Sequence, residues 1–107
     1  MDPLRGEVWE AHLPRRIGGH RVAVLTINTL IPRLSAVTVA VITGTEGPPS
    51  THVPVDGGAG LTGHDVSYIN AADLHTVDKP RLHRRRGMLS PSEMARFEEA
   101  VRLYLGL

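Results

Sequence analysis

The chain has 107 residues, a formal net charge of +1 at pH 7 and no cysteine. A chain of this length supports one hydrophobic core, so we expect a single domain over residues 1–107. The absence of cysteine excludes disulfides, thiolate metal ligands and a cysteine nucleophile. No apolar run approaches the roughly 20 residues that span a bilayer, and no signal peptide is evident, so we expect a cytoplasmic protein that does not contact a membrane.

The charged residues are unevenly distributed. Eleven of the twelve basic residues are arginine, and seven of these form two groups, whereas several acids gather near the C-terminus. Arginine matches the geometry of a phosphate, so the two groups favour contact with nucleic acid. A GC-rich coding sequence is the alternative explanation, and only four aromatic residues argue against an extended base-stacking platform. The groups are Arg15, Arg16 and Arg21, then Arg81, Arg84, Arg85 and Arg86, and the acids Glu93, Glu98 and Glu99.

The N-terminal third predicts a hairpin with a basic loop. Residues 6–13 alternate as a strand, and Pro14 with the following arginines and glycines breaks the pattern before an apolar strand over 21–28. Trp9 alternates into the predicted sheet and is expected in the core. The loop is either a solvated hairpin tip or a functional basic loop, and residue types alone do not decide between the two.

Further strands are predicted over residues 37–43, 51–55, 66–72 and 82–88. Strands 21–28 and 37–43 are the most continuously apolar, so they should be central in the sheet. The glycine-rich segment 56–60 is expected to form a turn that uses positive φ angles. Asp78 and Lys79 are expected to form a turn before Pro80.

The last segment changes to a helical period. Ser90, Pro91 and Glu93 have the N-cap, N1 and N3 pattern of a capping box, so a helix should begin at Pro91 and end at Gly106. Its apolar stripe is predicted to pack on the sheet and comprises Met94, Phe97, Val101 and Tyr104 or Leu105. The predicted fold is mainly β with one C-terminal helix: a small, strongly bent barrel of six strands closed by that helix.

Several motifs occur in the order typical of the MazF/PemK family of toxins, the ribonucleases of bacterial toxin-antitoxin pairs. Residues 5–9 resemble the family's opening strand, Gly19-His20-Arg21 resembles its Gly-x-Arg-Pro step, and the strand Val39 to Thr43 resembles the one that ends in the catalytic threonine. Residues 53–55, 60–61, 76–79, 87–94 and 105–107 resemble the family's second half. The resemblance implies an SH3-like barrel, which this family shares with the CcdB gyrase poisons.

The chain departs from the family pattern at three places. Val22 stands where the family has proline, which leaves the strand intact. Arg16 and Ile17 replace acidic and amide residues that many members carry in the first loop, so no carboxylate there takes part in catalysis. Ala72-Asp73 stands where many members have an acid followed by an amide, so the substrate preference of relatives does not carry over directly.

The resemblance implies cleavage of single-stranded RNA, without a metal, by attack of the ribose 2′-hydroxyl on the adjacent phosphate. It assigns catalysis to Arg21, which stabilises charge on the phosphate, and to Thr43, which hydrogen-bonds a non-bridging oxygen. His20 beside them is either a proton-transfer group or an RNA contact. Arg84, Arg85 and Arg86 alternate along one strand, so Arg85 should face away from its neighbours. The expected RNA contacts are Arg15, Arg16, Thr45, Arg84 and Arg86.

The remaining histidines do not have zinc-site spacing, because no pair falls at i, i+4 on a helix and no cysteine assists. They are His12, His52, His64, His75 and His83. We therefore expect no metal and no cofactor.

The expected function is a sequence-selective endoribonuclease toxin that arrests translation and growth. Two alternatives stay open: a non-enzymatic, CcdB-like toxin that binds a protein, and a catalytically inactive member that binds only the antitoxin. The expected partners are single-stranded RNA, a cognate antitoxin with an acidic disordered tail, and a second copy in a homodimer.

Overall fold

The computed structural model describes residues 1–56 and 66–107, and the expected glycine turn at 57–60, the motif residues 60–61 and His64 lie outside these ranges. All six expected strands are present: β1 (Glu7–His12), β2 (Gly19–Val24), β3 (Ala36–Thr43), β4 (His52–Val55), β5 (Ser67–Asp78) and β6 (Leu82–Met88). Short 3₁₀ turns lie at Ile31–Arg33 and Lys79–Arg81, and the helix α1 spans Pro91–Leu105. Of the turn expected at Asp78 and Lys79, Lys79 lies in the second 3₁₀ turn together with Pro80, whereas Asp78 is the last residue of β5.

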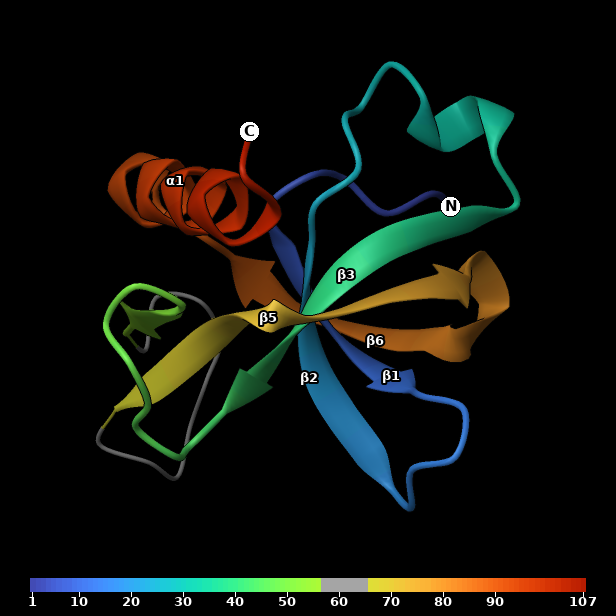
Figure 1. The fold of residues 1–107 in the computed structure, drawn as a ribbon. Helices are drawn as coiled ribbons and strands as arrows, with labels where there is room; N and C mark the ends of the chain where they lie inside the picture. Colours follow the sequence, from blue (N-terminus) through green and yellow to red (C-terminus); the bar gives the residue numbers. More distant parts are fainter. Residues whose placement is uncertain (57–65) are drawn as a thin grey trace.

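The strands form one antiparallel sheet in the order β4-β5-β3-β2-β1-β6. The two strands expected to be central, β2 and β3, are central. Figure 1 shows the strands crossing and diverging as the sheet twists, with α1 against one side. The mainly β fold with one C-terminal helix is confirmed. The expected closure into a barrel is wrong for the described residues, because the edge strands β4 and β6 pair with β5 and β1 and not with each other.

β5 is longer than the expected strand over 66–72. Its pairing with β3 shifts abruptly, from Ala40 opposite Leu74 to Val41 opposite Asn70. The residues between them form a bulge, which bends the strand and increases its twist. A mixed polar and apolar stretch after the bulge does not alternate cleanly, so the sequence pattern stops before the strand does.

The pleated sheet has a hydrophobic cluster on each face. We call them the helix-side core, which contains Phe97 and Val101 of α1, and the loop-side core, which contains Leu13 and Ile31 of the connecting loops. Trp9, expected in the core, is half-buried against the loop-side core. Strand residues alternate between the two faces. The helix-side core contains Val8, Ala23, Ala40, Ile42, Val53, Val55, Ile69 and Ala71, and the loop-side core Ala11, Val22, Val24, Val37, Val39, Val41, Val77 and Leu82.

The helix begins at Pro91 and its capping box is present. Ser90 Oγ accepts a hydrogen bond from the Glu93 backbone N–H at 3.1 Å, and Glu93 Oε1 accepts one from the Ser90 N–H at 2.8 Å. Gly106 ends the helix in the left-handed conformation with φ of 73°. The apolar stripe is shorter than expected, since Tyr104 and Leu105 are exposed.

Replacing Ser90 with alanine should lower the free energy of unfolding by about 1 kcal/mol, because the Glu93 N–H loses its acceptor at the helix start. Urea denaturation followed by far-UV circular dichroism measures this. Ser90→Asp, which keeps a capping oxygen, should stay close to the original stability. Equal losses in the two variants would contradict a capping role.

Candidate active site

β2 and β3 separate at one end of the sheet. Their pairing runs only over Val22–Val24 and Val39–Val41, starting at Val22 opposite Val41. Beyond this short pairing, the first residues of β2 pair only with β1, as far as Gly19 opposite His12. The last residues of β3 pair only with β5, as far as Thr43 opposite Tyr68. Figure 1 shows the start of β2 and the end of β3 diverging. We call this opening the β2–β3 fork; both of its arms lie within the described residues.

The two expected catalytic residues lie on opposite arms of this fork. Arg21 is on the β2 arm and Thr43 ends the β3 arm. Because side chains alternate along a strand, the Thr43 side chain starts on the loop-side face and the Arg21 side chain on the helix-side face. No hydrogen bond joins the two in the described part of the chain. Because the two strands are unpaired here, Arg21 lies on an arm that has no backbone pairing on its β3 side.

Arg21 is half-buried and makes no ion pair with any residue in the described ranges. Its cross-strand neighbour Glu10 is instead bonded to Arg86, with Nη1 to Oε1 at 3.0 Å. The positive charge of Arg21 is therefore available to an anion.

The Thr43 hydroxyl has a defined orientation. Its oxygen accepts a hydrogen bond from the Thr45 backbone N–H at 3.1 Å, which leaves the hydroxyl proton free to be donated. Thr45 itself is exposed in the turn that follows β3. A hydroxyl held in this way can donate to an anionic oxygen placed in the fork.

His20 lies on the β2 arm on the same face as Thr43. It pairs with Ala11 of the loop-side core, and its Nε2 is buried without a hydrogen-bond partner among the described residues. A buried ring nitrogen without a partner costs free energy, so it favours an incoming hydrogen-bonding group.

The loop between β1 and β2 is tied to β5 by an ion pair. Arg16 binds the Asp73 carboxylate through both terminal nitrogens, each at 3.0 Å, and His75 Nε2 lies 2.8 Å from Asp73 Oδ1. Partial burial would raise the pKa of Asp73, but the hydrogen bonds and positive charge of Arg16 and His75 outweigh it and lower the pKa below its ordinary value of 3.8. Asp73 is therefore charged at neutral pH.

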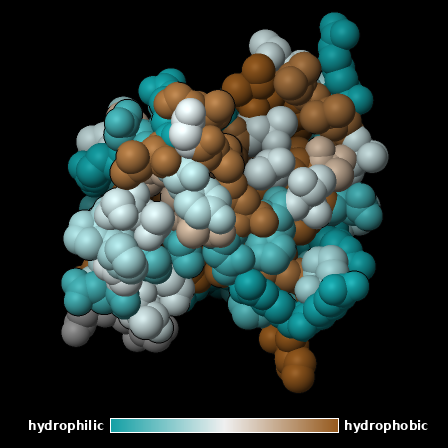
Figure 2. Space-filling model, in the orientation of Figure 1, coloured by the Kyte–Doolittle hydropathy of each residue, from teal (hydrophilic) through white to brown (hydrophobic). Residues whose placement is uncertain are grey.

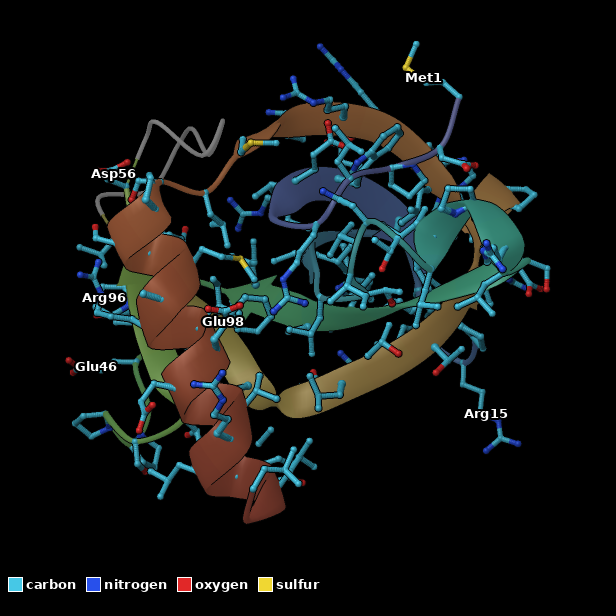
Figure 3. All side chains as sticks on the ribbon, turned by 90° about the horizontal axis from the view of Figure 1, so that it is seen from above. Met1, Arg15, Glu46, Asp56, Arg96 and Glu98 are labelled. Carbon is cyan, nitrogen blue, oxygen red and sulfur yellow. The ribbon has the colours of Figure 1, made fainter. Side chains whose placement is uncertain are left out.

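Arg15 adopts the left-handed conformation, with φ of 65°, in a turn closed by the Arg16 N–H and the Leu13 carbonyl at 3.3 Å. Its side chain is exposed, and Figure 3 shows it pointing away from the sheet. Glycine or asparagine is the usual residue at this position of such a turn.

Arg15→Gly should keep the fold and raise the free energy of unfolding by up to about 1 kcal/mol, because it relieves the strain of a left-handed non-glycine residue. Thermal unfolding measures the change. Arg15→Val, which is β-branched and tolerates positive φ poorly, should instead be destabilised; a Val variant as stable as the Gly variant would contradict the strain.

The arginines of β6 differ in their partners. Arg85 Nε binds the buried Glu7 carboxylate at 2.5 Å and Arg86 binds Glu10, whereas Arg84 is exposed and forms no ion pair with a described residue. Of the expected RNA-contact arginines, Arg16 and Arg86 are thus neutralised by carboxylates, and Arg15 and Arg84 are available.

Two histidines on neighbouring strands are in contact, His12 and His83, with ring centroids 4.2 Å apart. Within residues 1–56 and 66–107, however, no group of three or more acidic or histidine side chains could hold a metal ion. In the same ranges, no helix has the length and hydropathy needed to cross a membrane.

The family model of the PemK-like, MazF-like toxins of type II toxin-antitoxin systems matches residues 4–105. The chain belongs to this family. The match includes every strand and the helix, so the fork, the basic loop and the Arg16–Asp73 ion pair are features of a PemK/MazF-like toxin chain. No match is found among curated proteins.

Solved structures of PemK/MazF-like toxins have the same fold. A mycobacterial endoribonuclease in complex with its cognate antitoxin is 28% identical, with a TM-score of 0.87 over 98% of this chain and 96% of its own. The Mycobacterium tuberculosis toxin MazF-mt6 is 31% identical, with a TM-score of 0.83 over 94% and 97%. A MazE–MazF complex from Deinococcus radiodurans, 16% identical, shares the fold with a TM-score of 0.81 over 100% and 98%.

Sequence reasoning missed two polar residues around the fork. Tyr68 lies directly opposite Thr43 on the same face, and only the pairing register of β5 before its bulge places it there. Asp73 was noted as a departure from the family pattern, but not as the partner of Arg16, which is 57 residues away in the sequence. The one signal available in the sequence was charge: Arg16 and Asp73 both depart from the family pattern, and their side chains carry opposite charges.

Proposed function

We propose that the chain is a metal-independent endoribonuclease toxin that cleaves single-stranded RNA at selected sequences and thereby arrests translation and growth. The family membership supports this proposal, as do mycobacterial structures 27–28% identical that are named endoribonucleases. The observation that carries it is the pair of groups on the β2–β3 fork: an arginine without an ion pair in the described residues and a threonine whose hydroxyl proton is free.

In this proposal the ribose 2′-hydroxyl attacks the adjacent phosphorus, and the 5′ oxygen of the next nucleotide leaves. The products are a 2′,3′-cyclic phosphate and a 5′-hydroxyl. Arg21 stabilises the charge that develops on the phosphate oxygens, and Thr43 donates its hydroxyl proton to one of them. His20 is the candidate for proton transfer, because an imidazole can accept and donate a proton and its Nε2 has no partner among the described groups.

The RNA backbone is proposed to follow the basic surface beside the fork. Arg15 and Arg84 offer exposed guanidinium groups, and Thr45 lies in the turn next to Thr43. Arg16 and Arg86 contribute once their carboxylate partners are exchanged for phosphate. These contacts position the strand, whereas the recognised sequence depends on loop shape and base contacts.

Thr43→Val should reduce the cleavage rate at saturating RNA by about 10–100-fold, because valine has nearly the shape of threonine but no hydroxyl proton for the phosphate. Thr43→Ser should retain most of the activity. Single-turnover cleavage measures both variants. A serine variant as impaired as the valine variant would show that the methyl group, and not the hydroxyl, is required.

The test of the proposed function is cleavage of a mixed-sequence single-stranded RNA by purified protein in EDTA. Cyclic-phosphate and 5′-hydroxyl ends, with no cleavage where the 2′-hydroxyl at the cut site is replaced by hydrogen, are the expected result. Intact RNA in the presence of folded, antitoxin-free protein would instead favour a toxin that binds a protein or an inactive member. Cleavage that requires added divalent metal would contradict the mechanism.

The proposed partners are a cognate antitoxin with an acidic tail and a second copy of the chain. We also propose that residues 1–107 act as one toxin domain and that the protein acts in the cytoplasm. One of the solved relatives is bound to its cognate antitoxin. We propose that the acidic tail competes with RNA for the basic surface, so that saturating tail peptide should release bound RNA. Simultaneous binding of both without mutual weakening would contradict this competition.

The homodimer proposal has a candidate surface. Exposed apolar side chains lie on the N-terminal segment, the β2–β3 loop and the end of α1, and Leu25, Leu105 and Leu107 line one hollow there. Figure 2 shows apolar atoms gathered over this part of the molecule. Sedimentation should give a dimer that Leu105→Glu weakens. The exposed residues include Leu4, Ile27, Leu30, Leu34, Leu105 and Leu107.

A further inference from the structure

The Arg16–Asp73 ion pair bridges the β2–β3 fork. Arg16 lies in the loop that precedes β2, and Asp73 lies on β5, which is the strand beyond β3. The bulge that carries Asp73 falls between the pairs Ala40–Leu74 and Val41–Asn70, so Asp73 is level with Val41, two residues before Thr43. The pair therefore connects one side of the fork to the other beside the proposed catalytic threonine.

The ion pair lies on the same face as Thr43. Asp73 contacts His75, and His75 is opposite Val39, a residue of the loop-side core. Thr43 on β3 and His20 on β2 lie on this same face, nearer the open end of the fork. An RNA phosphate that reaches Thr43 from this face passes next to the Arg16–Asp73 pair.

Few other contacts hold the loop. Leu13 is anchored in the loop-side core, but the side chains from Pro14 to Ile17 are exposed, and Ile17 is fully exposed. Figure 2 shows the loop tip as an apolar projection from the molecule. Gly18 has a φ of 80°, and its Cβ position faces open space, as does that of Gly19. In the described contacts, Arg16 is the side chain of this loop tip that reaches the sheet.

In the free protein, Asp73 binds the Arg16 nitrogens that would otherwise bind a phosphate. Both terminal nitrogens of Arg16 are bonded to the carboxylate, in the bidentate geometry that arginine also uses for phosphate. The pair is accessible, with 36% of the Arg16 side chain and 25% of the Asp73 side chain exposed. An exposed ion pair is worth only about 1 kcal/mol, so an incoming phosphate can displace the carboxylate.

His75 makes this exchange less costly. Its Nε2 is bonded to Asp73 Oδ1, the oxygen that also accepts from Arg16 Nη2. When Arg16 leaves, the Asp73 carboxylate keeps a hydrogen-bond partner in His75.

We propose that the Arg16–Asp73 ion pair is a latch that holds the β1–β2 loop across the β2–β3 fork, and that an RNA phosphate displaces Asp73 from Arg16 when the substrate binds. Asp73 is then a positioning residue that acts through Arg16. The displacement half of this inference rests on the proposed function, whereas the latch itself is a property of the free protein.

The latch is tested on the free protein by hydrogen exchange of the backbone amides over residues 15–19. Asp73→Asn should exchange about fivefold faster there, the factor that corresponds to about 1 kcal/mol, because asparagine lacks the charge that holds Arg16. Asp73→Glu, which keeps the carboxylate, should restore most of the protection. The matched control is Asp78→Asn, which removes the same charge from an exposed position on the same strand. Equal exchange in all variants would overturn the latch.

The displacement is tested by fluorescence anisotropy with a mixed-sequence 2′-O-methyl RNA, which cannot be cleaved. Asp73→Asn should bind up to about fivefold more tightly, because Arg16 is released, and Asp78→Asn should bind nearly as the original protein does at 0.15 M salt. Arg16→Gln should bind more weakly, and adding Asp73→Asn to it should change nothing further.

The outcomes separate the two halves of the inference. Tighter binding from Asp73→Asn that persists with Arg16→Gln would mean a general charge effect and would overturn displacement from Arg16. Unchanged or weaker binding of Asp73→Asn would also overturn it. Absence of RNA binding by every variant would contradict the proposed function and the displacement together, whereas the hydrogen-exchange result would still decide whether the latch exists.

Discussion

Arg21→Ala should reduce the cleavage rate at saturating RNA by at least about 100-fold, because it removes the permanent charge that faces the phosphate in the transition state. No carboxylate in the described residues neutralises Arg21, in contrast to Arg16 and Arg86. The half-buried position also strengthens its interaction with an anion relative to water. Single-turnover cleavage in EDTA, with protein in excess of RNA and well above the dissociation constant, measures the effect on chemistry separately from binding.

Two control variants separate the catalytic role of Arg21 from simple attraction of RNA. Arg21→Lys keeps the charge but not the bidentate geometry, so it should recover only part of the lost rate. Arg84→Ala removes an exposed cation from β6 and should weaken RNA binding, most visibly at lower salt, with little change in the saturated rate. Cleavage that survives in Arg21→Ala would contradict the assignment and direct attention to His20.

Elements with a local signal were predictable from the sequence. The helix start depends on Ser90, Pro91 and Glu93, which lie within one turn and make the observed cap. The central strands are apolar on both faces because each face carries a core, and this produces the continuous apolar runs that placed β2 and β3 in the middle of the sheet. Local chemistry therefore determined these elements largely on its own.

Features that depend on register were not predictable in the same way. The bulge in β5 shifts the pairing between Leu74 and Asn70, and it places Asp73 beside Arg16 and Tyr68 opposite Thr43. Closure into a barrel was wrongly expected, because short strands and turns do not indicate whether the two edge strands pair with each other. Arg21 and Thr43 were named by family resemblance, whereas the separation of their strands became visible only from the pairing in the structure.

Phe97→Ala should be the most damaging change in the core. Phe97 is fully buried in the helix-side core, where it joins α1 to the sheet. Its truncation removes buried apolar surface and leaves a cavity, which typically costs about 3–5 kcal/mol. Because a small domain has about 5–15 kcal/mol of stability in total, the melting temperature should fall by at least about 12 °C. Differential scanning calorimetry measures the change.

Tyr104→Ala is the matched control, since it also truncates an aromatic residue of α1 but at an exposed position that the sequence pattern had assigned to the core stripe. Its stability should change by no more than about 0.5 kcal/mol. Phe97→Leu, which keeps most of the buried volume, should lose clearly less stability than Phe97→Ala. Similar losses in Phe97→Ala and Tyr104→Ala would mean that helix propensity, and not the contact of α1 with the sheet, determines the effect. A loss confined to Phe97 instead identifies this side chain as the link through which the C-terminal helix stabilises the sheet that positions the fork.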